Sequence, residues 1–195
     1  MSNGRDTIDM KPYNILLLIT IVLSFTGCES NDTEINRTED SNQYVSDSFF
    51  PMAVGNYWRI NDQNYTEITD TIRIEGVLYY EVYSLIGGDA SLTEYLRIDN
   101  ENTLIQRSPT NVAWNYVKAK FNSSIGDTFF TLKDSSYNDL KVTTISKSED
   151  NIQFEYQMTY HPILTDKHIV VYKKGLGLVE NWKEVRIDGV IYTYD

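Results

Sequence analysis

Alternation of apolar and polar residues with a period of two constrains the fold of this 195-residue chain more than any other feature of its sequence. The clearest run covers residues 151–160, where Ile152, Phe154 and Tyr156 alternate with polar residues. Successive side chains of a β-strand point to opposite faces, so this pattern predicts a strand with one buried face and one wet face. Residues 71–74 and 184–187 show shorter runs of the same kind.

Turn-forming residues separate these runs at short intervals. Glu75-Gly76 and Asp188-Gly189 stand at the centres of two similar segments, residues 73–79 and 186–192. Glycine accepts the positive φ that a type I′ turn requires, which makes such a dipeptide a strong hairpin signal. We therefore predict the same hairpin at two places in the chain.

The fold class follows from these patterns. No amphipathic helix of useful length is visible, and 15 Tyr and 3 Trp favour strands. We expect roughly nine to eleven antiparallel strands, and an open sheet of that many strands has to curl. The prediction is an all-β fold with one strongly curled antiparallel sheet, a barrel or half-barrel, with a two-sheet sandwich as the alternative.

The N-terminus has the order of a signal peptide. Lys11 precedes an apolar run at residues 15–23, which is too short to cross a bilayer as a helix. Residues 24–28, Ser-Phe-Thr-Gly-Cys, resemble the lipobox of bacterial lipoproteins, with Phe25 in place of the usual leucine. The resemblance implies cleavage before Cys28 and lipid on that cysteine; an ordinary secretory leader is the alternative. Translation can start at Met1 or Met10.

These features divide the chain into three parts. We predict a lipoprotein signal peptide at residues 1–27, a flexible tether at 28–47 and a single β-domain at 48–195, because residues 29–48 hold almost no apolar side chains. The acidic residues Glu29, Asp32 and Glu34 resemble sequences that send lipoproteins to the cell surface in some Gram-negative lineages, or belong to a plain solvated linker. The expected location is the cell envelope, anchored by lipid to the outer membrane and facing the periplasm or the surface.

Charge and cysteine content exclude several functions. The formal net charge of −11 argues against binding to nucleic acid or to anionic lipid. Cys28 is the only cysteine, so the chain forms no intramolecular disulfide and has no thiol left for catalysis.

Two further stretches carry a second resemblance. Residues 49–58 (Phe-Phe-Pro-Met-Ala-Val-Gly-Asn-Tyr-Trp) and 174–180 (Lys-Gly-Leu-Gly-Leu-Val-Glu) are similar to motifs of a poorly characterised group of exported lipoproteins, for which no activity is established. Both motifs have packing explanations: Trp58 should be buried in the core, and Gly175 and Gly177 should permit a bulge or a close approach of the backbone. No convergent polar group accompanies the glycines in the sequence.

Residues for catalysis or metal binding are few. His161 precedes Pro162, and the spacing to His168 puts the two rings on opposite faces of a continuous strand. No Gly-X-Ser-X-Gly motif is present. Asp99, Glu101 and Asp62 match no calcium loop, so turn chemistry explains them better. We expect no enzyme, no metal and no cofactor, although two carboxylates from distant strands would suffice for a glycosidase.

Aromatic residues are the remaining feature. Tyr and Trp suit glycan stacking and protein interfaces, but cross-strand pairing explains most of them. The first half of the chain holds Tyr79, Tyr80, Tyr83, Tyr95, Trp114 and Tyr116.

The function expected from the sequence is a lipid-anchored, non-catalytic binding domain of the cell envelope. Its partners would be the membrane, through lipid on Cys28, and an unknown protein, glycan or apolar ligand, with no nucleic acid. The alternatives are a half-barrel carrier of an apolar ligand or lipid and a carboxylate-dependent hydrolase.

Overall fold

A computed structural model describes residues 47–194 of the chain. The predicted signal peptide, the lipidation site Cys28 and nearly all of the predicted tether lie outside the described residues. Within residues 47–194 no helix is long and apolar enough to cross a membrane. The ordered elements of this part are strands.

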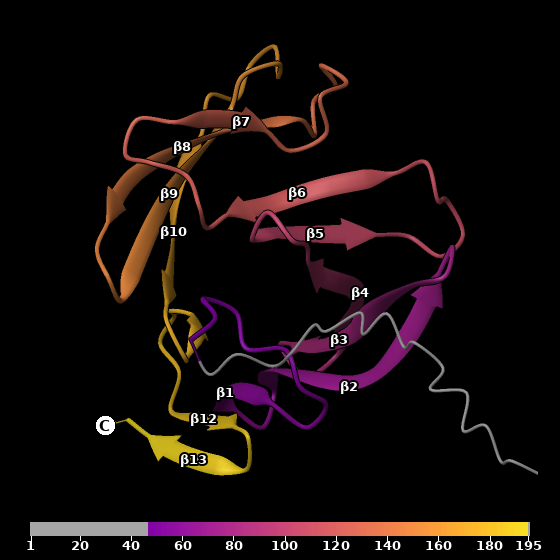
Figure 1. Cartoon of the computed structure of the whole chain (residues 1–195), viewed down its shortest axis with the longest axis vertical. Coiled ribbons are helices and arrows are strands. Elements are labelled where there is room, and N and C mark those ends of the chain that lie inside the picture. Colours follow the sequence, from indigo (N-terminus) through magenta and orange to yellow (C-terminus); the bar gives the residue numbers. More distant parts are fainter. Residues whose placement is uncertain (1–46, 195) are drawn as a thin grey trace, which may run out of the picture. The chain divides into compact units, whose positions relative to one another are not determined.

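Thirteen strands form two antiparallel sheets (Figure 1). The larger sheet has the order β13-β12-β1-β2-β3-β4-β5-β6, and the smaller has the order β11-β10-β9-β8-β7. The strands are β1 (Tyr57–Asn61), β2 (Asn64–Ile74), β3 (Val77–Ile86), β4 (Ala90–Ile98), β5 (Thr103–Arg107), β6 (Asn115–Lys120), β7 (Thr128–Phe130), β8 (Leu140–Lys147), β9 (Asn151–Met158), β10 (Lys167–Lys173), β11 (Gly177–Leu178), β12 (Glu184–Ile187) and β13 (Val190–Thr193). The all-β, antiparallel prediction is confirmed.

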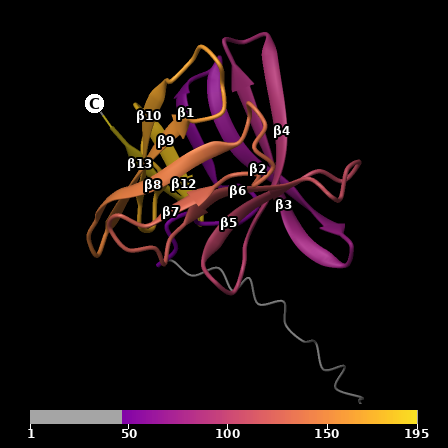
Figure 2. The ribbon, with the colours of Figure 1, turned by 90° about the horizontal axis from the view of Figure 1, so that it is seen from above.

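The expected barrel or half-barrel is wrong, because neither sheet is closed or strongly curled. The strands of residues 47–194 divide into two sheets instead, which fits the two-sheet alternative (Figure 2). The break lies between β6 and β7, where one backbone hydrogen bond, from Val117 N–H to the Thr131 carbonyl (2.8 Å), takes the place of a ladder. β7 has three residues, and all of them pair with β8 in the smaller sheet.

The two predicted hairpins are confirmed. β2 and β3 are joined by Glu75 and Gly76, with φ of 52° and 82°, and β12 and β13 by Asp188 and Gly189, with φ of 51° and 77°. Positive φ at both central residues is the geometry of a type I′ turn, whose twist matches the strands that it joins. The second hairpin brings β12 back beside β1, which connects the C-terminal strands to the start of the larger sheet.

The core lies between the two sheets. On β9, Ile152, Phe154 and Tyr156 are buried, as the alternation predicts. Phe121 and Phe154 meet the ring of Tyr172 edge-on, with centroids 5.2 and 6.1 Å apart. The same buried cluster includes Trp58, Val82 and Leu96 of the larger sheet, so the core joins the sheets where the hydrogen-bond ladders do not.

The two motifs at residues 49–58 and 174–180 meet in this core. Trp58 is 2% exposed, as predicted, and its indole N–H donates to the Leu176 carbonyl at 2.6 Å. A Cβ on Gly177 would lie 3.0 Å from the Trp58 ring, so glycine is needed for this close approach. Phe50 stacks on Trp58 with ring centroids 5.3 Å apart. The predicted packing role of both motifs is confirmed.

Candidate functional site

A cavity of about 340 Å³ lies between the two sheets. It falls within the size range of small-molecule sites. We call it the inter-sheet cavity. Strands β1 to β6 supply most of its wall, and β10, β11 and the segment after β11 supply the rest. Its lining comprises Phe50, Trp58, Ile60, Asn64, Tyr65, Thr66, Val82, Ser84, Leu85, Ile86, Glu94, Leu96, Leu104, Lys118, Tyr172, Leu178, Glu180 and Trp182.

Two pairs of polar side chains interrupt the apolar wall of the larger sheet. Thr66 and Ser84 are direct cross-strand partners on β2 and β3, and their hydroxyls lie 2.9 Å apart. Glu94 on β4 and Lys118 on β6 form an ion pair of 2.6 Å, in which the two side chains are 16% and 25% exposed. The cavity therefore has hydrogen-bonding groups on one wall of an otherwise apolar space.

The short segment after β11 supplies the opposite wall. Glu180 ends the second motif, and Trp182 follows two residues later. The Trp182 indole N–H donates to the Leu178 carbonyl at 2.7 Å, which fixes the ring. The Glu180 carboxyl is partly buried, which raises its pKa, although the residue as a whole is exposed. Glu180 thus stands at the border between the cavity and solvent.

Two buried tyrosines lie in or next to the cavity lining. Tyr172 lines it directly, and burial raises the pKa of its hydroxyl well above the usual value. Burial likewise raises the pKa of Tyr156, whose hydroxyl donates to the Lys118 carbonyl. Both hydroxyls are therefore protonated at neutral pH, so they contribute hydrogen bonds and no charge.

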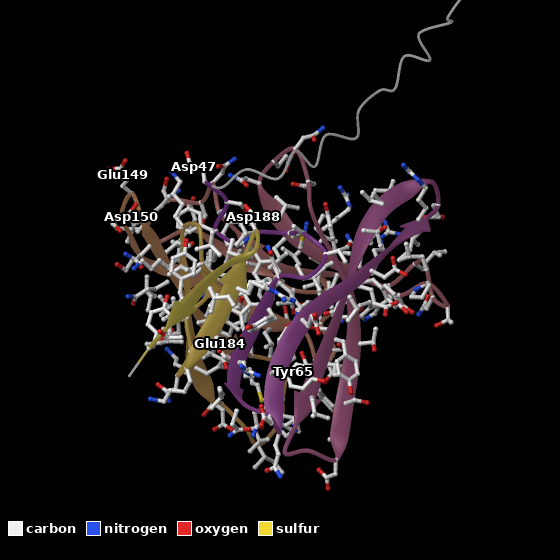
Figure 3. All side chains as sticks on the ribbon, turned by 90° about the horizontal axis from the view of Figure 1, so that it is seen from below. Asp47, Tyr65, Glu149, Asp150, Glu184 and Asp188 are labelled. Carbon is white, nitrogen blue, oxygen red and sulfur yellow. The ribbon has the colours of Figure 1, made fainter. Side chains whose placement is uncertain are left out.

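A second hollow of about 590 Å³ lies between the first described residues, Asp47 to Phe50, and the ends of β4 and β8. Figure 3 shows Asp47 near Glu149 and Asp150 at this end of the molecule. Lys147 donates to the Phe121 and Ser123 carbonyls here, at 2.9 and 2.8 Å. This hollow borders the point where the described part of the chain begins, so it is not a defined site.

The outer face of β1, β2 and β12 carries a network of paired charges (Tyr65 and Glu184 in Figure 3). The Arg186 guanidinium lies 4.5 Å from the centroid of the Tyr57 ring. Arg59 binds Glu184 at 2.7 Å, and the Tyr57 hydroxyl donates to the same carboxylate. These charged groups pair with one another across strands. Their contacts stabilise the sheet, and this explains their presence without a ligand.

Neither histidine lines the cavity. His161 lies in the loop after β9, where its Nδ1 accepts a hydrogen bond from the Leu164 N–H at 2.8 Å. His168 stacks on its cross-strand partner Tyr156 with ring centroids 5.0 Å apart. Within residues 47–194 no group of His, Cys, Asp or Glu is placed to hold a metal. Asp99 accepts from the Glu101 and Thr103 N–H groups at 2.9 Å each, which is the expected turn chemistry.

The aromatic residues singled out in the sequence mostly serve the sheet. Tyr79 and Tyr80 are buried on β3, and Tyr83 lies beside Tyr65 with centroids 6.1 Å apart. Trp114 stacks on Tyr116 at 5.8 Å, outside the cavity. The aromatic residues of the cavity lining come from the first motif, β2, β10 and the segment after β11; they are Phe50, Trp58, Tyr65, Tyr172 and Trp182.

Sequence reasoning missed the polar groups of the cavity. The available signal was Glu94, which occupies the same face of β4 as Leu92 and Leu96, a face that alternation assigns to the interior. A charged residue on such a face requires a partner or a function. The partner, Lys118, lies two strands away, and nothing in the sequence links the two positions.

Comparison with known proteins adds nothing to this description, because no family model, curated protein or solved structure matches the chain.

Proposed function

We propose that this chain is a lipid-anchored, non-catalytic binding domain of the bacterial cell envelope, whose ligand site is the inter-sheet cavity. The observation that supports this most directly is the composition of the cavity wall: apolar and aromatic surfaces from both sheets, with a few fixed polar groups among them. Small-molecule sites have this combination, because apolar walls give affinity and a few polar groups orient the ligand.

The polar groups are hard to explain by stability alone. A largely buried ion pair such as Glu94 and Lys118 contributes little, and apolar residues of the same volume are often as good or better. The Thr66 and Ser84 hydroxyls likewise occupy positions where the sheet would pack with apolar side chains. A ligand that uses these groups gives a reason for their presence.

Both motifs contribute to the same cavity. Phe50 and Trp58 come from the first, and Leu178 and Glu180 come from the second. The segments that resemble other exported lipoproteins therefore supply both the packing of the core and part of the cavity wall. In this proposal, lipid on Cys28 keeps the domain at the membrane, facing the periplasm or the cell surface.

A carboxylate-dependent hydrolase is the second candidate, because Glu94 and Glu180 line the same cavity. Two carboxylates can serve as acid and base. We rank this reading second because the Glu94 carboxylate is already bound by Lys118 at 2.6 Å. Turnover of an ester or glycoside panel that disappears in both Glu94→Gln and Glu180→Gln would favour the enzyme. A carrier of lipid ranks third, since the polar wall does not suit an acyl chain.

Binding can be tested on the chain from residue 28 onward with Cys28→Ser, which we call the soluble form. Three probes share one shape and differ in charge: 2-phenylethylamine, 2-phenylethanol and phenylacetate. The chain has three tryptophans, and the indole N–H signals of Trp58 and Trp182 report on the cavity while that of Trp114 serves as an internal control.

At least one probe should shift the Trp58 and Trp182 signals in a saturable manner and leave Trp114 unchanged. Ser84→Trp, which fills the cavity, should abolish the effect. Ser91→Trp adds the same side chain at an exposed position of β4 outside the cavity lining and should preserve it. If no probe binds, or if both variants bind as the parent does, the proposed site is wrong.

A further inference from the structure

The charges that line the inter-sheet cavity do not balance. Glu94 and Glu180 are acidic, and Lys118 is the basic residue of the lining. Lys118 pairs with Glu94 at 2.6 Å. Within residues 47–194 no hydrogen bond or ion pair joins the Glu180 carboxylate to another residue, and burial is the cause that shifts its pKa. The Glu180 carboxylate at the border of the cavity is therefore unpaired, although Lys173 and Lys183 line a neighbouring hollow that also includes Glu180.

The two tryptophans of the cavity lining have no free donors, and Trp182 offers ring surface to a ligand. The indole N–H of Trp58 donates to the Leu176 carbonyl at 2.6 Å, and that of Trp182 donates to the Leu178 carbonyl at 2.7 Å. Trp58 is buried against the stacked Phe50 ring, so the π-system that remains toward the cavity is that of the half-buried Trp182. The face of an indole carries partial negative charge and attracts cations as well as apolar groups.

The remaining polar groups do not suit an anion. Lys118 already pairs with Glu94 at 2.6 Å, which neutralises most of the charge that it would offer an anion. The Thr66 and Ser84 hydroxyls can accept hydrogen bonds as well as donate them, so they suit an ammonium group. The chain as a whole carries a net charge of −11, which raises the local concentration of cations.

We infer that the inter-sheet cavity binds a small organic cation, with its charged group beside Glu180 and its apolar body against Trp182 and Leu178. This inference rests on the proposed function and specifies the ligand class for the same site. The cation has two possible sources, a free amine or the side chain of Lys or Arg at the end of a peptide. Both offer a cationic head on an apolar stem.

The test compares the affinities of the three isosteric probes for the soluble form, followed by the indole signals of Trp58 and Trp182. The amine should bind about tenfold more tightly than the alcohol, since one charge interaction at a partly exposed site contributes about that factor. Phenylacetate should bind most weakly of the three. Added salt should reduce the advantage of the amine.

Glu180→Gln should remove most of the preference for the amine while leaving the binding of the alcohol unchanged. Glu149→Gln makes the same change of charge at an exposed residue outside the cavity lining and should leave the preference intact. A peptide amide ending in Phe-Lys with a blocked N-terminus supplies the second source. Tighter binding of that peptide than of the amine identifies a peptide side chain as the ligand, and the reverse identifies a free amine.

Two results would overturn the inference. If the alcohol binds as tightly as the amine, the cavity is a binding site but does not select a cation, and the proposed function survives. If Glu180→Gln and Glu149→Gln lower the amine affinity equally, the preference comes from the net charge of the chain and Glu180 has no special part in it. Absence of binding by all three probes would remove the proposed function as well.

Discussion

Replacement of Trp58 by alanine tests how the fold supports the cavity. Trp58 is 2% exposed, stacks on Phe50 and donates to the Leu176 carbonyl. Loss of a buried aromatic side chain costs about 3–5 kcal/mol. Leu176 also loses its donor, which adds roughly 1 kcal/mol. Since a domain has about 5–15 kcal/mol in total, Trp58→Ala should remove a large share of the stability.

Urea denaturation of the soluble form, followed by far-ultraviolet circular dichroism, measures this loss without relying on tryptophan fluorescence. The midpoint of thermal unfolding should fall by roughly 10–15 °C, because 1 kcal/mol corresponds to a few degrees in a domain of this size. Tyr137→Ala is the control, since Tyr137 is 61% exposed and should lose less than about 1 kcal/mol. If the free energy of unfolding of Trp58→Ala lies within about 1 kcal/mol of that of the parent, Trp58 does not contribute to stability as its burial predicts.

Three further predictions concern separate parts of the chain. Gly177→Ala should destabilise the domain by at least about 1 kcal/mol more than Gly126→Ala, because both have φ near +90° but Gly177 alone has a ring 3.0 Å from the added Cβ; equal losses would show that the contact with Trp58 is unimportant. At Asp139, burial tends to raise the pKa, but hydrogen bonds from four backbone N–H groups outweigh it and leave the pKa below its usual 3.8. The folded-state pKa is thus lower than the unfolded one, so the stabilisation is present above the unfolded pKa and is lost as the pH falls through the folded pKa. Asp139→Asn should flatten the stability profile in that acid range, and a profile parallel to that of the parent would contradict the assignment. Cys28→Ser in the full chain should yield protein that leaves the membrane fraction or stays as uncleaved precursor, and normal processing with membrane retention would exclude lipidation at Cys28.

Local features of the fold follow from the sequence. The burial of Ile152 and Phe154 follows from alternation, and the two type I′ turns follow from Glu75-Gly76 and Asp188-Gly189. Each depends on neighbours within a few residues. The burial of Trp58 was predicted from its apolar surroundings in the motif.

The arrangement of the sheets does not follow from the sequence in the same way. Closure of a barrel depends on a continuous ladder from β6 to β7 and on to the remaining strands. β7 pairs with β8 and not with β6, and alternation within a strand does not report which strand is its neighbour. Strand count alone therefore predicted a curled sheet where two sheets form.

The cavity depends on contacts between distant positions. Glu180 is 86 residues from Glu94 in the chain, and both line the same space only because β11 folds across the larger sheet. Glu180 is the last residue of a motif that packing explains. Its charge alone therefore did not indicate a binding site in the sequence. The pairing of Lys118 with Glu94 leaves Glu180 without a basic partner in the cavity. This pairing is visible in the folded structure and not in the sequence.

A crystal structure of the soluble form grown with 2-phenylethylamine tests the central claim most directly, because it locates the probe. We predict that the phenyl ring lies in the inter-sheet cavity against Trp182 and Leu178, with the ammonium group within hydrogen-bond distance of Glu180. A probe bound on the outer face beside Tyr57 and Arg186, with the cavity unchanged, would contradict the claim that this cavity is the ligand site.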